Sequence, residues 1–235
     1  MKKENELEGI KSLLEIRVFA YDLLRRTFLD EPSREFLFNL VEKGLIEAFP
    51  FIWEDGNIQE GVRQVSDFFK KYDSNNEDMY IDLRLDYTRL FIGPYELPAP
   101  PWESAYLSQE RLLFQKQTLE VRQVYLKYGL LPKHFKQEAD DHLGLELDFM
   151  FQLSNRSLKI LETEDFRRLA EIVQDQKDFL QEHLLKWVPD FSINVIENSQ
   201  YGFYQGMARI LKGYLVLDLQ ALEELEDMEI VGSLN

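Results

Sequence analysis

A proline-rich stretch interrupts an otherwise helical pattern near the middle of this chain. Four of the eight prolines fall between Pro94 and Pro101, directly after Gly93. Proline fixes its own φ and disfavours helix in the residue before it. We therefore predict an extended, stiff connector over residues 93–101. Five aromatic residues lie on or beside this connector: Tyr87, Phe91, Tyr95, Trp102 and Tyr106.

Apolar residues recur at helical spacing through most of the remaining chain, and no segment alternates with the period of a strand. Helices are expected over residues 7–28, 34–48, 58–72, 80–91, 103–128, 141–159, 164–180, 187–198 and 201–225. Ser33, Asp140 or Asp141, and Thr163 are expected to cap the helices that follow them, and Gly129 is expected to end the helix over 103–128. The prediction is an all-α protein: a single globular bundle of about ten helices spanning residues 1–235, with a hinge at 129–139.

The charge of the chain restricts its partners. The 235 residues carry a formal net charge of −16, which repels phosphate backbones and attracts basic peptides. We therefore expect no nucleic-acid binding. The chain has no cysteine, which excludes disulfides and thiolate metal sites and fits a reducing compartment. No signal peptide and no membrane-spanning stretch are expected, so we predict a soluble, cytoplasmic protein without membrane insertion.

A polar cluster opens the predicted helix at 141–159. It holds Asp140, Asp141, His142 and Glu146, and the last two are four residues apart, on one helical face. Three interpretations remain open: an aspartate caps the helix, the cluster binds a divalent metal, or it anchors a cationic ligand. His134 is the nearest further histidine, so a metal site would have few ligands.

The aromatic residues around the connector also have two interpretations. Tyr87 and Phe91 are four apart on one helical face, so they either pack in the core or line a binding site. Trp102 either pins the connector to the rest of the protein or contacts a ligand. Because a stiff backbone loses little entropy on docking, the connector suits a binding site. Glu103 and Ser104 are read only as residues of a helix N-terminus.

Two motifs carry a resemblance to a known family. Leu-Phe-Ile-Gly-Pro at 90–94 is followed by Pro-Pro-Trp-Glu-Ser-Ala-Tyr at 100–106, and then by Glu-x-x-Asp-His-Leu-Gly-Leu-Glu-Leu at 138–147. In this order and separation they resemble the TorD/DmsD/NarJ family of redox-enzyme maturation chaperones. Tyr201-Gly-Phe-Tyr204 also matches the family pattern.

The resemblance implies a cytoplasmic chaperone that binds the twin-arginine leader and apoprotein of a molybdenum-containing oxidoreductase and assists its maturation before export. It favours the cationic-ligand interpretation of the Asp-His pair. The implied peptide-binding residues are Tyr87, Phe91, Tyr95, Pro101, Trp102, Glu138, Asp141 and His142. We expect Tyr87, Phe91, Tyr95 and Trp102 to form the floor of an apolar groove. Glu138, Asp141 and His142 are expected to form its acidic mouth.

No catalytic or phosphate-binding motif is present in the sequence, so we predict neither an enzyme nor a cofactor. One alternative is a metal-dependent hydrolase that uses His142, Glu146 and Asp141. Another is an assembly factor that binds a folded reductase subunit rather than a leader. Exchange of helices about the hinge at 129–139 would give a homodimer.

Overall fold

A computed structural model describes residues 2–71, 77–108, 116–131 and 139–227. These residues form ten α-helices and two π-helical turns and contain no strand. The elements are α1 (Lys2–Phe28), α2 (Arg34–Glu42), α3 (Gly56–Lys71), α4 (Glu77–Tyr87), η1 (Thr88–Ile92), α5 (Glu103–Leu107), α6 (Lys116–Lys127), α7 (Leu143–Glu162), α8 (Phe166–Phe179), η2 (Leu180–Leu184), α9 (Leu185–Asn198) and α10 (Gly202–Asp227). The predicted all-α class and helix number are therefore confirmed.

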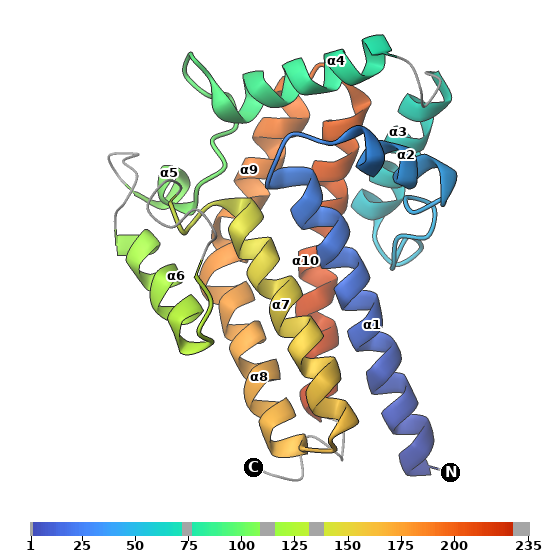
Figure 1. Ribbon diagram of the computed structural model, residues 1–235, viewed down its shortest axis with the longest axis vertical. Helices are drawn as coiled ribbons and strands as arrows, with labels where there is room; N and C mark the ends of the chain where they lie inside the picture. Colours follow the sequence, from blue (N-terminus) through green and yellow to red (C-terminus); the bar gives the residue numbers. More distant parts are fainter. Residues whose placement is uncertain (1, 72–76, 109–115, 132–138, 228–235) are drawn as a thin grey trace.

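Four long helices run side by side along the long axis of the molecule: α1, α7, α8 and α10 (Figure 1). Helix α1 packs along α7, and α3 packs along α10. At the upper end of the view, α4 crosses the bundle, while α6 lies on its flank (Figure 1). The proline-rich connector leaves η1 at this upper end and leads to the short helix α5.

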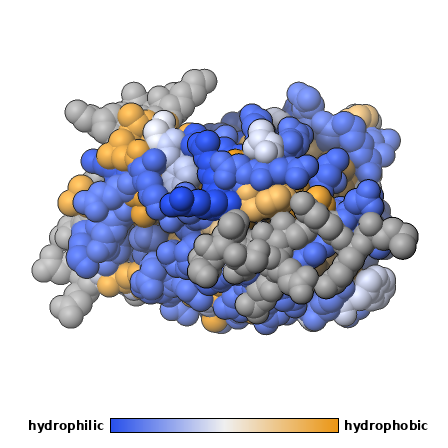
Figure 2. Space-filling view, turned by 90° about the horizontal axis from the view of Figure 1, so that it is seen from below, coloured by the Kyte–Doolittle hydropathy of each residue, from blue (hydrophilic) through white to orange (hydrophobic). Residues whose placement is uncertain are grey.

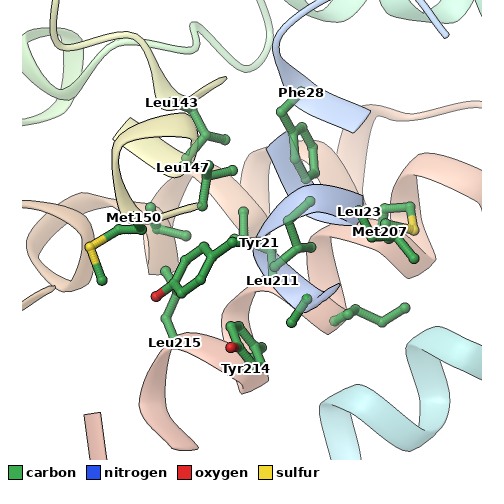
Figure 3. Close-up of a cluster of buried hydrophobic side chains, with 14 of the residues drawn as sticks. Tyr21, Leu23, Phe28, Leu143, Leu147, Met150, Met207, Leu211, Tyr214 and Leu215 are labelled. Atoms are coloured by element: carbon green, nitrogen blue, oxygen red, sulfur yellow. The ribbon is translucent and has the colours of Figure 1, made fainter. Parts of the chain in front are cut away.

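The core forms between α1, α7 and α10 because each helix buries the apolar residues of one face. Tyr21, Leu147, Met150 and Tyr214 come from these three helices and meet in the same interior (Figure 3). All four side chains are fully buried. The apolar periodicity that predicted these helices therefore reflects their packing in the core.

Helix ends follow the predicted local signals in two places. The hydroxyl of Ser33 accepts the backbone N–H of Phe36 at 3.1 Å and caps α2. Gly129 follows α6 with φ +64°, a conformation that glycine adopts without strain. The predicted cap Thr163 is wrong, because it lies at the C-terminus of α7, and Asp165 caps α8 instead.

The predicted helix over 103–128 is also wrong. It is interrupted at Ser108, where the backbone is extended (φ −85°, ψ 140°) after only five residues of α5. By contrast, α8, η2 and α9 follow one another without a gap, although Pro189 lies inside α9. Proline removes one backbone donor from a helix, and the π-turn at 180–184 changes the hydrogen-bond pattern just before it.

Three expectations stay predictions. Residues 132–138 of the predicted hinge lie outside the described residues, so neither the hinge nor a homodimer built on it is tested. The single-domain organisation is not tested either.

None of the described helices combines the length and apolar character needed to cross a membrane.

Candidate functional site

The two family motifs meet through a short backbone pairing. Trp102 and His142 form an isolated antiparallel bridge. The N–H of Glu103 donates to the carbonyl of Asp141 at 3.0 Å, and the N–H of Leu143 donates to the carbonyl of Pro101 at 2.8 Å. The end of the proline-rich connector is thereby joined to the start of α7. We call this junction of residues 101–104 with residues 141–143 the motif corner.

Asp141 is fully buried in the motif corner. One carboxylate oxygen accepts the backbone N–H of Ser104 at 2.9 Å, and the other accepts the hydroxyl of Thr118 at 2.8 Å. These two bonds stabilise the buried charge and fix α5 and α6 against the start of α7. The expectation that Asp141 forms a surface acidic mouth is therefore wrong in this structure, because both of its oxygens are occupied inside the protein.

His142, and not an aspartate, caps α7. Its Nδ1 accepts the backbone N–H of Gly144 at 3.0 Å, so in the neutral ring the proton resides on Nε2. The imidazole is buried, and it packs edge to face with the ring of Trp102, with the centroids 5.8 Å apart. His142 thus packs against Trp102. The predicted capping role of Asp140 or Asp141 is wrong.

Tyr87 and Phe91 lie in the core rather than on a groove floor. Both side chains are buried, and their rings pack edge to face with centroids 5.0 Å apart. Phe91 stacks on Phe191 at 5.9 Å, and the hydroxyl of Tyr87 donates to the carbonyl of Phe28 at 3.2 Å. The expected open floor is wrong for these two residues, because α1 and α9 cover the inner face of their helix.

The remaining predicted site residues are divided between interior and surface. Pro101 is buried, Trp102 is half-buried, and Tyr95 is 86% exposed. Glu138 lies outside the described residues. The structure therefore brings Pro101, Trp102, Asp141 and His142 together. Tyr95, Trp102 and Tyr106 are the aromatic residues on or beside the connector that keep exposed surface.

A second buried polar cluster lies beside the motif corner, and sequence reasoning missed most of it. Nδ1 of His183 lies 2.9 Å from Oε2 of Glu103, and the indole N–H of Trp187 donates to Glu146 at 3.2 Å. All four side chains are buried. They join α5, α7, η2 and α9. The signal in the sequence was the position of Glu146 and His183 among leucines, which indicates that these two polar side chains are buried.

Glu146 has an altered acidity in this cluster. Burial, followed by the negative charges of Glu103 and Asp141, raises the pKa of Glu146 well above its ordinary value. Because a metal ligand must be a carboxylate with a free oxygen, this environment does not suit a hydrolase built on His142, Glu146 and Asp141. Among the described residues, no three His, Cys, Asp or Glu side chains are placed to hold a metal ion.

Replacing Glu146 with glutamine is expected to flatten the pH dependence of stability. The raised pKa means that native Glu146 keeps a proton that the unfolded chain has already released. The stabilising contribution of protonated Glu146 is complete below the pKa that this residue has in the unfolded chain. It is lost as the pH rises through the pKa that it has in the native protein. For one proton, the slope of the free energy of unfolding against pH should become less negative by up to about 1.4 kcal/mol per pH unit.

Urea unfolding between pH 5 and pH 8.5 measures this slope. Glutamine keeps an acceptor for Trp187, so the packing is retained. The matched control is Glu182→Gln, because Glu182 is exposed beside Lys186 and its pKa is lowered rather than raised. A constant difference in stability between wild type and Glu146→Gln over this range would contradict the assigned protonation.

A separate groove of about 1180 Å³ lies between α6, α7 and α8. Five basic and four acidic side chains line it, including Lys127, Arg156, Lys159 and Asp175. The lower end of the molecule, where α7 turns into α8, is mostly hydrophilic (Figure 2). Charged side chains of both signs line this groove, so its charge does not favour a peptide with a basic end.

Comparison with known proteins identifies the relatives of this chain. Residues 55–192, more than half of the chain, match the family model described as nitrate reductase delta subunit. A TorD chaperone from Vibrio atlanticus is 26% identical over 92% of this chain and 99% of its own length. A TorD chaperone from Aliivibrio salmonicida is 29% identical over 93% and 98%. These relatives are named as chaperones and not as enzymes, in agreement with the predicted absence of catalysis.

A solved structure from Archaeoglobus fulgidus, described as a redox enzyme maturation protein, aligns with 90% of this chain and 93% of its own. Its sequence identity is 22% and its TM-score is 0.43, which is too low to support conclusions about the site. The family resemblance seen in the motifs is nevertheless confirmed by the family model and the curated relatives. The chain belongs to the nitrate reductase delta subunit family and is similar to TorD chaperones over nearly its whole length.

Proposed function

We propose that this protein is a cytoplasmic chaperone that binds the twin-arginine leader of a molybdenum-containing oxidoreductase and assists maturation of the apoprotein before export. The observation that carries the proposal is the motif corner. There a backbone bridge holds the half-buried Trp102 next to His142 at the end of a stiff connector. The similarity to TorD chaperones over almost the full chain supports the same function.

The charge and the energetics agree with a leader as ligand. A net charge of −16 attracts a peptide with a basic start. Exposed ion pairs contribute about 0–1 kcal/mol each, whereas micromolar affinity corresponds to about −8 kcal/mol. Burial of a leucine-sized side chain contributes about 1.5–3 kcal/mol. Apolar contacts must therefore supply most of the affinity, and the arginines set orientation and association rate.

The residues of the site divide into two roles. Trp102 and Tyr95 have surface available for contact, and Glu138 remains a predicted contact with the basic part of the leader. Asp141 and His142 act indirectly, because they hold α5 and Trp102 in place. This assignment changes Asp141 from a predicted ligand contact to a positioning residue.

Two substitutions of Asp141 separate positioning from direct attraction. Asparagine removes the charge, but its carbonyl can accept the N–H of Ser104 and its amide can donate to Thr118. Alanine removes both bonds. We expect Asp141→Ala to weaken leader binding at least about 10-fold and Asp141→Asn to change it less than about 3-fold. Calorimetry with a synthetic twin-arginine leader peptide measures both affinities.

Three outcomes decide the proposal. Equal losses in Asp141→Asn and Asp141→Ala would show that Asp141 attracts the arginines by its charge. No binding of twin-arginine peptides to the wild-type protein would contradict leader recognition itself. A Trp102→Ala variant, which shortens an aromatic side chain at the motif corner, should also weaken binding, and its thermal unfolding shows whether the fold is retained.

A second candidate is an assembly factor that binds a folded subunit of the oxidoreductase. The match to a family model described as nitrate reductase delta subunit favours keeping it. Capture of a client whose leader has been deleted distinguishes the two functions. Undiminished capture would favour the assembly factor, and loss of capture would favour the leader-binding chaperone.

A further inference from the structure

An exposed apolar stripe follows the outer face of α4 and η1. These two elements form one uninterrupted helical segment over residues 77–92. The inner face buries Leu83, Tyr87, Leu90 and Phe91 against the bundle, whereas the outer face carries apolar residues that remain exposed. The exposed fractions are 44% for Ile81, 63% for Leu85 and 59% for Ile92.

Ile81 and Leu85 are four residues apart in α4 and lie in one sector of its surface, and Ile92 lies one π-turn further along, in η1. A helix at the surface normally presents polar residues on its outer face, so apolar residues in this sector are unexpected. Eleven residues separate the first from the last, which corresponds to about 16 Å along the axis. The stripe leads directly into the connector, where Tyr95 is the next exposed apolar side chain.

The charges around the stripe favour a basic partner. Residues 77–96 contain five acidic and two basic residues, a formal charge of −3. Both arginines form ion pairs within the protein: Arg84 with Glu31 at 2.7 Å and Arg89 with Asp86 at 2.6 Å. Two of the five acidic residues are also paired, Asp86 with Arg89 and Glu77 with Arg34. The formal charge of the segment stays negative, which favours a basic partner.

The backbone of the segment restricts how a peptide binds there. A helix satisfies its own backbone donors and acceptors, so it offers a partner side chains only and cannot pair with an added strand. An apolar stripe on a helix is complemented by the apolar face of another helix, with anchors at positions i, i+3, i+4 and i+7. About three turns of such a helix match the length of the stripe.

We propose that the stripe of Ile81, Leu85 and Ile92 binds the apolar stretch of the leader as a short amphipathic helix, while the motif corner lies beyond its Tyr95 end. This inference rests on the proposed leader-binding function and adds a second contact surface to it. Net acidity, apolar side chains and continuity with the connector select a basic peptide with an apolar face rather than a neutral or acidic partner.

The test uses the full chain and a fluorescent synthetic twin-arginine leader peptide, with affinity measured by anisotropy. Leu85→Gln removes apolar surface without changing charge or interrupting the helix. We expect it to weaken binding at least 10-fold, and Ile81→Gln to weaken it at least 3-fold. The matched control is Val216→Gln, which changes a 46% exposed apolar residue on α10 and should alter affinity less than 2-fold.

The outcomes separate this inference from the proposed function. If wild type binds the peptide and Trp102→Ala weakens binding while Leu85→Gln and Ile81→Gln do not, the stripe is not the contact surface and leader recognition stands. If wild type does not bind, the function itself fails. Equal weakening by Val216→Gln would also overturn the stripe, because the effect would then not depend on position. Circular dichroism of the bound peptide, read as a difference spectrum, should show an increase in helix.

Discussion

Replacing Asp218 with alanine is expected to lower the free energy of unfolding by about 3–5 kcal/mol. Asp218 of α10 is fully buried and pairs with the equally buried Arg17 of α1 through contacts of 2.6 and 3.1 Å. The hydroxyls of Tyr21 and Tyr214 donate to the same carboxylate at 2.6 and 3.3 Å. Alanine would leave a guanidinium and two hydroxyls without their common acceptor.

The protonation states support this expectation. Burial alone would lower the pKa of Arg17, but the Asp218 carboxylate raises it above its ordinary value, so the guanidinium stays charged. Burial and the same carboxylate raise the pKa values of Tyr21 and Tyr214. Without Asp218, the free-energy cost of removing the Arg17 cation from water is no longer offset by its attraction to a carboxylate. The expected loss is therefore larger than the net contribution of the intact ion pair.

Urea unfolding at pH 7 measures the loss. The matched control is Asp67→Ala on the exposed face of α3, where Asp67 pairs with Arg63 and Lys70 in solvent. That change should cost no more than about 1 kcal/mol. A loss below 1 kcal/mol for Asp218→Ala would show that water reaches Arg17 and solvates its guanidinium group. The double variant Asp218→Ala/Arg17→Met should recover part of the lost stability, since the apolar methionine side chain needs no hydrogen-bonding partner.

Replacing Gly144 with alanine is expected to lower the free energy of unfolding by about 1–3 kcal/mol. An added Cβ at Gly144 would lie 2.4 Å from the Cα of Leu29 and 2.8 Å from its backbone nitrogen. Backbone atoms cannot rotate away, so α7 would have to move from the end of α1. Because Gly144 also donates to His142, the same shift would disturb the motif corner.

The chain contains a matched control for this substitution. Gly9 lies within α1, and an added Cβ there would meet no atom within 4 Å. Gly9→Ala should therefore increase stability by about 0.5–1 kcal/mol through helix propensity. Thermal and urea unfolding compare the two variants. A gain in stability for Gly144→Ala would mean that α1 and α7 separate at low cost and that the glycine is not required for their contact.

Much of the fold could be predicted from local patterns. Apolar residues at helical spacing marked the long helices, Ser33 and Gly129 marked helix ends, and charge and cysteine content restricted the partners. These features depend on neighbours within a few residues, which a sequence contains directly. Two features were not predicted: the interruption at Ser108 after α5, and the continuous run from α8 through η2 into α9. Local patterns indicated one helix over 103–128 and a break between residues 180 and 187 instead.

The candidate site was predictable as a set of residues but not as a surface. The sequence indicated, through its resemblance to a family, that both motifs contribute to one site, and in the structure the bridge between Trp102 and His142 joins them. Only the tertiary structure decided that Tyr87 and Phe91 are covered while Leu85 is exposed. The helix over 77–92 is apolar on more than one face, so its own periodicity does not show which face α1, α9 and α10 will bury. Likewise, a carboxylate such as Asp141 becomes internal only when donors from distant segments, here Ser104 and Thr118, compensate its lost hydration.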